Sequence, residues 1–196
     1  MSKNIKNDLE KLLLLYDKRL YRQSIFDGME ELQMSLYEEG LKLLEEKFGN
    51  GKDNVISLST VAREPDADGN PQPVVRDVDA YYADGVFYVT TYAKSNKMQQ
   101  IDKNPAVSVA VCFGWFTAIG KGENLGWVLY PKNAGLRDRL RTVFAEWYDK
   151  ANNEKDENCC ILAVRLTRGT LNVNHWEKLY HMDFVNKTTM ENGGIF

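Results

Sequence analysis

Residues 86–105, VFYVTTYAKSNKMQQIDKNP, contain the pattern that decides the fold of this chain. The first seven residues, 86–92, are rich in β-branched and aromatic side chains, which is typical of a β-strand. Residues 94–103 have a helix-like pattern, and Asn104–Pro105 ends it because the residue before a proline avoids the helical region. The stretch therefore predicts a strand that turns directly into a short helix.

Further strand-like segments lie on both sides of this stretch. On its N-terminal side, 54–62 and 72–82 are separated by the dense turn signal DADGNP, which predicts a β-hairpin. On its C-terminal side, four segments are strand-like, at 106–113, 116–130, 160–168 and 170–176. Gly120 and Gly122 predict a bulge or a close backbone approach within the second of these.

Six or seven consecutive strands with few helices between them predict a mainly β, α+β fold. We expect an antiparallel sheet that closes, or nearly closes, into a barrel. A parallel doubly wound sheet would need a helix between most pairs of strands, and only two helical interruptions are predicted here.

The first fifty residues have a helical pattern. Apolar residues at three- and four-residue spacing predict one helix over 5–22 and a second that runs to about Phe48, with a break around Ser24–Gly28. A cluster of glycines then ends the second helix. Another amphipathic helix is predicted over 134–149, and the tail from Lys187 is expected to be frayed.

We therefore expect a helical extension, a barrel domain and a tail, at 1–50, 51–187 and 188–196. The sequence leaves open whether the extension packs on the barrel or on a dimer.

Composition excludes several classes of function. The chain has 196 residues and a net charge of −3, which gives no general attraction to nucleic acid or to an anionic membrane. Two histidines and three cysteines are too few for a zinc site of ordinary spacing, so no metal site is expected. The N-terminus lacks the pattern of a signal peptide or a membrane span. We expect a cytoplasmic protein.

A cluster of hydroxyl and basic side chains is the best candidate for a binding site. Thr91 ends the strand at 86–92, and Ser95 and Lys97 lie at the start of the following helix, where free N–H groups attract anions. If 72–82 pairs with 86–92 as a hairpin, Arg76 reaches the same place and could hold a phosphate. Alternatively, Ser95 only caps the helix, and Arg76 forms surface ion pairs with its neighbours Asp77 and Asp79.

The order of these segments resembles the FMN-binding split β-barrel of the pyridoxamine 5′-phosphate oxidase family. The resemblance covers roughly 54–176 and is carried by five motifs, namely Arg76-x-Val78, Tyr88–Val89–Thr90–Thr91, Ser95–Asn96–Lys97, Asn104–Pro105-x-Val107 and Ile119–Gly120–Lys121–Gly122–Glu123.

This resemblance implies a cofactor and its site. Arg76 and Lys97 would hold the phosphate of FMN, with hydrogen bonds from Ser95, beside Asn96, and from Thr91. Val78 and the strand end that includes Val89 and Thr90 would lie along the isoalloxazine ring. The family's site straddles a homodimer, so Trp115, Phe116 or Trp176 would come from the partner chain.

The resemblance also implies flavin redox chemistry on a small molecule. A hydride would pass from a reduced donor to the flavin, whose electrons would then go to an acceptor. The sequence identifies no catalytic side chain and no substrate. It lacks the Arg-x-His element with which the family's authentic oxidases grip their substrate, which argues against that particular activity.

Two other interpretations remain open. A binding or sensing protein could hold flavin or haem without turnover, with His175 or His181 as an iron ligand. A barrel that has lost its ligand would leave Arg76 and Lys97 as ordinary surface charges.

Overall fold

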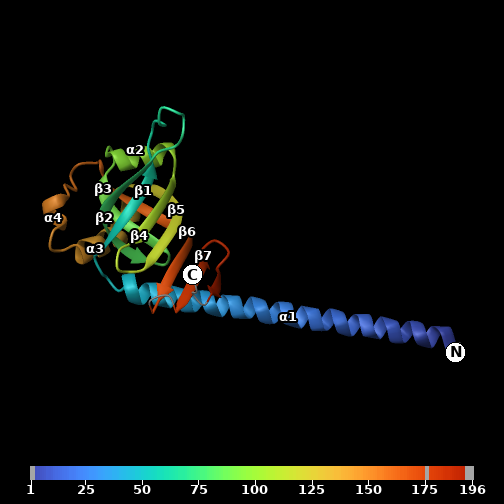
Figure 1. The fold of residues 1–196 in the computed structure, drawn as a ribbon. Helices are drawn as coiled ribbons and strands as arrows, with labels where there is room; N and C mark the ends of the chain where they lie inside the picture. The colour runs from blue at the N-terminus through green and yellow to red at the C-terminus, as the bar shows by residue number, and fades with distance from the viewer. Residues whose placement is uncertain (1–2, 175–176, 193–196) are drawn as a thin grey trace.

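Strand β3 (Val86–Tyr92) pairs with two different strands and thereby closes the sheet. In the computed structural model, which describes residues 3–174 and 177–192, the strands follow the order β3-β2-β1-β4-β5-β6-β7-β8, and all neighbours are antiparallel. A further pairing joins β3 to β6, so the first six strands of this order form a barrel (Figure 1). The predicted antiparallel split barrel with flanking helices is confirmed.

The other strands agree with the predicted segments in the first two thirds of the chain. They are β1 (Asn54–Val61), β2 (Pro73–Ala83), β4 (Ala106–Val111) and β5 (Phe116–Trp127). The predicted hairpin forms, since β1 pairs with β2 from Asn54↔Ala80 to Val61↔Pro73. A register shift follows Ile119, and a Cβ on Gly120 would collide with the carbonyl oxygen of Arg165. The predicted bulge and close backbone approach are thus both present.

The C-terminal third differs from the prediction. The segments 160–168 and 170–176 are one long strand as far as the structure describes them, β6 (Cys159–Val173), which pairs with both β5 and β7. The expectation that the tail from Lys187 is frayed is wrong for residues 188–192. These residues form β8 (Thr188–Asn192), which pairs with β7 (Lys178–Asp183) and extends the sheet. Asp183 stabilises the turn between them by accepting backbone N–H bonds from Val185 and Asn186.

Strand β6 is buried on both faces, and this explains the two hydrophobic clusters. Inside the barrel, Cys160, Leu162 and Val164 pack with the main core. On the other face, Cys159 and Ile161 pack under the helices that follow β5, namely α3 (Ala134–Val143) and the single turn α4 (Tyr148–Ala151). The predicted helix over 134–149 is therefore interrupted after Val143. A short 3₁₀ turn, η1 (Pro131–Asn133), precedes it.

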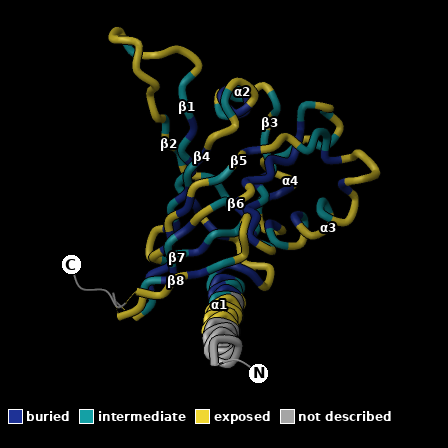
Figure 2. Tube along the Cα trace, turned by 90° about the vertical axis from the view of Figure 1, so that its right-hand side faces the viewer, coloured by how far each residue is buried: buried dark blue, intermediate teal, exposed yellow. Residues whose placement is uncertain are grey.

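The N-terminal extension is one helix, α1 (Lys3–Phe48), and the predicted break around Ser24–Gly28 is wrong. Asp27 accepts a hydrogen bond from the side chain of Gln23 one turn earlier, at 2.8 Å, instead of starting a new helix. Gly28 costs a helix interior only about 1 kcal/mol relative to alanine, which does not end it. From about residue 18 to residue 32 the helix projects from the barrel as an exposed rod (Figures 1 and 2).

The last turns of α1 are part of the core. Leu44 and Phe48 are buried, and the ring of Phe48 contacts those of Tyr82, Phe87 and Phe116 at centroid distances of 5.7–6.3 Å. Helix α2 (Asn96–Lys103) covers the barrel with buried Met98, Gln100 and Ile101. Within the described part of the chain, no helix is both long enough and apolar enough to cross a membrane.

We predict that Phe48→Ala lowers the free energy of unfolding by about 3–5 kcal/mol, because it opens a cavity among three aromatic rings. Urea denaturation measures the change. Phe113→Ala is the matched control, since Phe113 is 90% exposed, and it should change stability by less than about 0.5 kcal/mol. Equal effects of the two substitutions would contradict the placement of α1 against the barrel.

Candidate functional site

A cavity of about 580 Å³ lies between strands β2 and β3 and the segment that contains α4. Five of the residues that the resemblance assigns to the cofactor line it: Val78, Val89, Thr90, Thr91 and Lys97. The remaining walls carry polar and aromatic side chains, including Asp77, Asp79, Tyr92, Trp147, Asn152 and Asp156. The structure therefore gathers around one space the residues predicted to contact the ring and two of the four predicted to contact the phosphate, Thr91 and Lys97, whereas Arg76 and Ser95 do not line it.

Lys97 is a partly buried cation without a carboxylate partner. It forms no ion pair with any described residue, and burial together with the charge of Arg76 lowers the pKa of its ammonium group. A buried cation without an opposite charge is costly, and a second cation beside it adds to the cost. An anionic ligand between the two would remove that cost.

Arg76 is close enough to Lys97 for its charge to lower the pKa of that lysine, and its own guanidinium is held by neutral groups. Its guanidinium donates to the carbonyl oxygen of Leu58 at 3.2 Å, to Thr60 Oγ1 at 2.6 Å and to Gln100 Oε1 at 2.9 Å. Burial lowers the pKa of Arg76. The alternative of surface ion pairs with its sequence neighbours does not hold, since it has no ion pair with either aspartate and successive side chains of a strand point to opposite faces.

Two hydroxyl oxygens in this region have no partner. Ser95 occupies the N-cap position of α2 with extended backbone angles, but its side chain makes no capping hydrogen bond. Its Oγ and the Oγ1 of Thr90 are buried and accept or donate no hydrogen bond to the described residues. A buried unpaired hydroxyl costs about 1–3 kcal/mol. Both atoms are suited to meet polar atoms of a ligand, as are the N–H groups in the first turn of α2.

The contacts that bring Arg76 toward Lys97 differ from the expected ones. Strand β2 pairs with β3 only over Tyr81–Ala83 and Val86–Tyr88, because β3 then continues along β6. Arg76 instead pairs with Leu58 of β1, and helix α2 brings Gln100 and Lys97 toward it. The predicted hairpin of β2 and β3 therefore forms, but its paired residues do not include Arg76, which contacts α2 at Gln100 instead.

The wall formed by 147–156 was not predicted as part of a site. An ionic network fixes this segment, since Arg137 donates to both carboxylate oxygens of Glu154 and Tyr148 donates to one of them. The indole N–H of Trp147 donates to Asp53. The loop 152–158 looks like a solvated surface segment in the sequence, and no local pattern marks its role as a wall.

The predicted aromatic contacts are not gathered here. Phe116 is 1% exposed and fills the barrel core, and Trp115 lies half-exposed in the turn between β4 and β5 with a positive φ of 54°. Neither lines the cavity. Asn96 begins α2 and is exposed. Trp176 and His175 lie outside the described residues.

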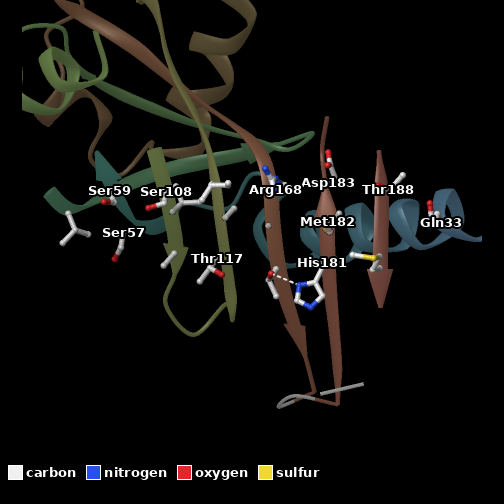
Figure 3. A pocket seen from close by; sticks show the side chains of 18 residues that line it. Gln33, Ser57, Ser59, Ser108, Thr117, Arg168, His181, Met182, Asp183 and Thr188 are labelled. Carbon is white, nitrogen blue, oxygen red and sulfur yellow. Dashed lines mark hydrogen bonds between the residues drawn. The ribbon is translucent and has the colours of Figure 1, made fainter. Parts of the chain in front are cut away.

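A second cavity of about 860 Å³ lies on the outside of the sheet (Figure 3). Hydroxyl side chains from several strands line it, together with His181, whose Nδ1 is 3.1 Å from Thr170 Oγ1. Arg168 and Asp183 lie opposite each other in the β6–β7 register and also line it. This cavity contains none of the residues predicted to bind the cofactor, apart from the haem alternative at His181.

Comparisons with known proteins place the fold. No protein-family model and no curated protein matches the chain significantly. Among solved structures, an FMN-binding protein related to pyridoxamine 5′-phosphate oxidase from Nostoc punctiforme is 15% identical, with a TM-score of 0.52. The match covers 73% of this chain and 87% of that one.

Two further structures are similar. A Clostridium acetobutylicum protein related to general stress protein 26, of the pyridoxinephosphate oxidase family, is 12% identical over 79% of this chain and 98% of that one (TM-score 0.50). A haem-binding protein from Mycobacterium smegmatis is 14% identical over 74% of this chain and 59% of that one (TM-score 0.52). At these identities the likeness concerns the fold: the chain has the split β-barrel fold found in pyridoxamine 5′-phosphate oxidase-related proteins.

Proposed function

We propose that this protein binds FMN and is an oxidoreductase. The observation that carries the proposal is the pair of adjacent cations, Arg76 and Lys97, which have no carboxylate partner among the described residues. Lys97 lies in the first turn of α2, where the Ser95 hydroxyl is buried and makes no hydrogen bond with the described residues, and Arg76 contacts the same helix at Gln100. Two cations, a hydroxyl and free N–H groups match a phosphate monoester in charge and in hydrogen-bonding capacity.

The rest of the cofactor would lie in the cavity beside the cations. Its volume of about 580 Å³ falls within the range of small-molecule sites, roughly 300–1,000 Å³. Val78 and Val89 would contact the apolar part of the isoalloxazine ring, and Thr90 would hydrogen-bond to its polar edge. A solved FMN-binding protein with the same fold supports this choice of ligand.

The side chains of this site bind and orient the cofactor. When bound, FMN would supply the redox chemistry by taking a hydride from a reduced donor and passing electrons to an acceptor. The chain would anchor the phosphate with Arg76 and Lys97 and orient the ring against β3. Trp147 and Asn152 would limit water and substrate access from the side of α4.

We also propose that the protein is a homodimer with FMN at the subunit interface. Val75, Ile119 and Met190 line the outer cavity and are 67%, 49% and 62% exposed in the single chain, and a second copy on this face would cover them. Trp115 would then be available to the partner's site. A mass in solution that corresponds to one chain would contradict this part of the proposal.

Haem binding is the alternative function. His181 lines the outer cavity, its Nδ1 is already hydrogen-bonded to Thr170, and a haem-binding protein shares the fold. The visible spectrum of the purified protein separates the two functions. Bound FMN would give the visible absorption bands of an oxidised flavin, whereas a Soret band that is lost in His181→Ala would replace the flavin proposal with haem binding.

We predict that the protein binds FMN at least about tenfold more tightly than riboflavin, which lacks the phosphate, since charge-assisted hydrogen bonds contribute about 1.5–3 kcal/mol each. In the double variant Arg76→Gln/Lys97→Met, FMN affinity should fall to that of riboflavin. Titration of flavin fluorescence measures both constants. Riboflavin affinity is the internal control, because it should change little, and a double variant that keeps its preference for FMN would rule out the phosphate site.

We predict that Lys97→Met weakens FMN binding by about 10- to 100-fold yet raises the melting temperature of the flavin-free protein. The folded-state pKa of Lys97 lies below the unfolded value, so its charged form destabilises the free protein at neutral pH. Stability of the flavin-free wild type should rise as the pH increases through that lowered pKa, and the variant should lack this rise. Differential scanning calorimetry from pH 7 to 10 tests both statements.

Lys94→Met is the matched control for this prediction. Lys94 is exposed and lies three residues earlier in the same turn, so its substitution should change neither quantity. A lower melting temperature for flavin-free Lys97→Met would contradict the interpretation of Lys97 as an uncompensated cation.

A further inference from the structure

Two buried polar side chains hold one end of the Arg76 guanidinium. Nη1 donates to Thr60 Oγ1 at 2.6 Å and Nη2 donates to Gln100 Oε1 at 2.9 Å, while the hydroxyl of Thr60 donates to the same amide oxygen at 2.6 Å. Thr60 is 2% exposed and Gln100 is 8% exposed. Each of these donors meets an acceptor, so the group fixes the guanidinium between β1, β2 and α2.

The same contacts leave one edge of the guanidinium free. Nη1 gives its second hydrogen to the carbonyl oxygen of Leu58 at 3.2 Å. Three of the five N–H donors are therefore used, whereas Nε–H and the second hydrogen of Nη2 donate to no described residue. These two donors share an edge of the planar group, and an arginine edge can bind two oxygen atoms of one phosphate at once.

The side chains that hold Arg76 carry no charge, in contrast to the partners of other arginines in this protein. Three arginines form ion pairs at 2.6–2.7 Å, namely Arg137 with Glu154, Arg141 with Asp149 and Arg165 with Glu123. In each of these pairs the carboxylate neutralises the guanidinium. The amide of Gln100 supplies a hydrogen-bond acceptor without a negative charge, so the charge of Arg76 is not neutralised.

Packing alone does not account for Thr60 and Gln100. Burying polar groups costs free energy that their hydrogen bonds offset, and apolar side chains of similar volume would fill the space between β1 and α2 without this cost. Gln100 also follows Lys97 by three residues, which places the two on one face of α2. A carboxylate at position 100 would therefore lie near both cations.

We propose that Thr60 and Gln100 are positioning residues for the phosphate of the ligand. They hold one end of Arg76 as uncharged acceptors, which keeps its positive charge and its Nε–Nη2 edge for the ligand. The inference rests on the proposed function, because FMN supplies the phosphate. It adds a requirement that the two cations alone do not impose, since residue 100 must accept hydrogen bonds and must also be neutral.

Gln100→Glu tests the requirement for neutrality. Glutamate has the shape of glutamine and accepts both hydrogen bonds, but its charge forms an ion pair with Arg76. The preference for FMN over riboflavin, measured by flavin fluorescence as the ratio of the two dissociation constants, should fall by about tenfold. A purely structural role of Gln100 would not change this ratio, because both flavins use the same ring site. An unchanged ratio would overturn the inference.

Gln99→Glu is the matched control. Gln99 is the neighbouring residue of α2, and its amide oxygen accepts a 2.7 Å hydrogen bond from Arg63, an exposed arginine outside the site. The substitution adds the same charge to the same helix, yet the preference for FMN should change by less than about twofold. A loss equal to that of Gln100→Glu would reveal a general effect of charge on α2 and would overturn the inference.

Gln100→Met tests the requirement for an acceptor. Methionine keeps the length of the side chain but removes the amide oxygen, so Arg76 keeps its charge and loses part of its fixed orientation. The preference for FMN should fall by about three- to tenfold. Thr60→Val, which replaces the hydroxyl with a methyl group, should change the preference in the same direction. Full preference in both variants would rule out the positioning role.

Inorganic phosphate separates a failure of this inference from a failure of the proposed function. A wild type that does not prefer FMN over riboflavin would make the proposed cofactor wrong, and phosphate is then the ligand of the test. Phosphate should raise the melting temperature of the wild type and of Gln99→Glu, but not that of Gln100→Glu. Equal stabilisation of all three proteins, or of none, would overturn the inference. If the wild type and Gln100→Glu prefer FMN equally, only the inference fails and the proposed function stands.

Discussion

The pairing of β3 with β6 is the constraint on which the rest of the structure depends. Seven consecutive residue pairs, from Val86↔Arg165 to Tyr92↔Cys159, join the first part of the sheet to its last long strand. This pairing turns an open sheet into a barrel, which removes two edges that would otherwise expose unpaired backbone groups. It also draws β3 away from β2 after only three residue pairs. The site lies in the region where these two strands separate, with Val78 on one and Thr90 on the other.

The location of the site also explains its electrostatics. Helix α2 covers the barrel and brings Lys97 close enough to Arg76 for the two positive charges to repel each other. Among the described residues, no carboxylate forms an ion pair with either of them. A fold under selection for stability alone would place a carboxylate there or leave both cations in solvent. Groups that destabilise the free protein are common at binding sites, because their charges and hydrogen-bonding groups are complementary to those of a ligand and not to one another.

Local patterns in the sequence were sufficient for most of the barrel. Alternating and β-branched segments located β1 to β5, and the turn signal at 66–71 located the first hairpin, because both are determined by neighbouring residues. The phosphate-binding candidates could also be found, since a strand end followed by Ser95 and Lys97 is a local signal. The contact between Arg76 and α2 could not be derived in this way. It results from barrel closure, which joins residues far apart in the chain.

Other features depended on long-range packing and were missed or mistaken. The wall at 147–156 is positioned by Glu154, which meets Arg137 and Tyr148 across a loop that has no distinctive composition. Strands β7 and β8 are short and polar, and they exist because β6 extends far enough to pair with β7. In α1, Ser24, Asp27 and Gly28 resemble a helix boundary, but their individual preferences are weak compared with the continuity of the helix around them.

The double burial of β6 has a chemical consequence for its two adjacent cysteines. Burial raises the pKa of Cys159 to about 11 and that of Cys160 to about 12, so at neutral pH both sulfurs are thiols and hardly any thiolate forms. Oxidants and electrophiles attack the thiolate. Cys159 borders the cavity proposed for a redox cofactor, and in its thiol form we expect it to react slowly with peroxide and with disulfides. The strand that closes the barrel thus holds the sulfur of Cys159 as an unreactive thiol beside the cavity proposed for the cofactor.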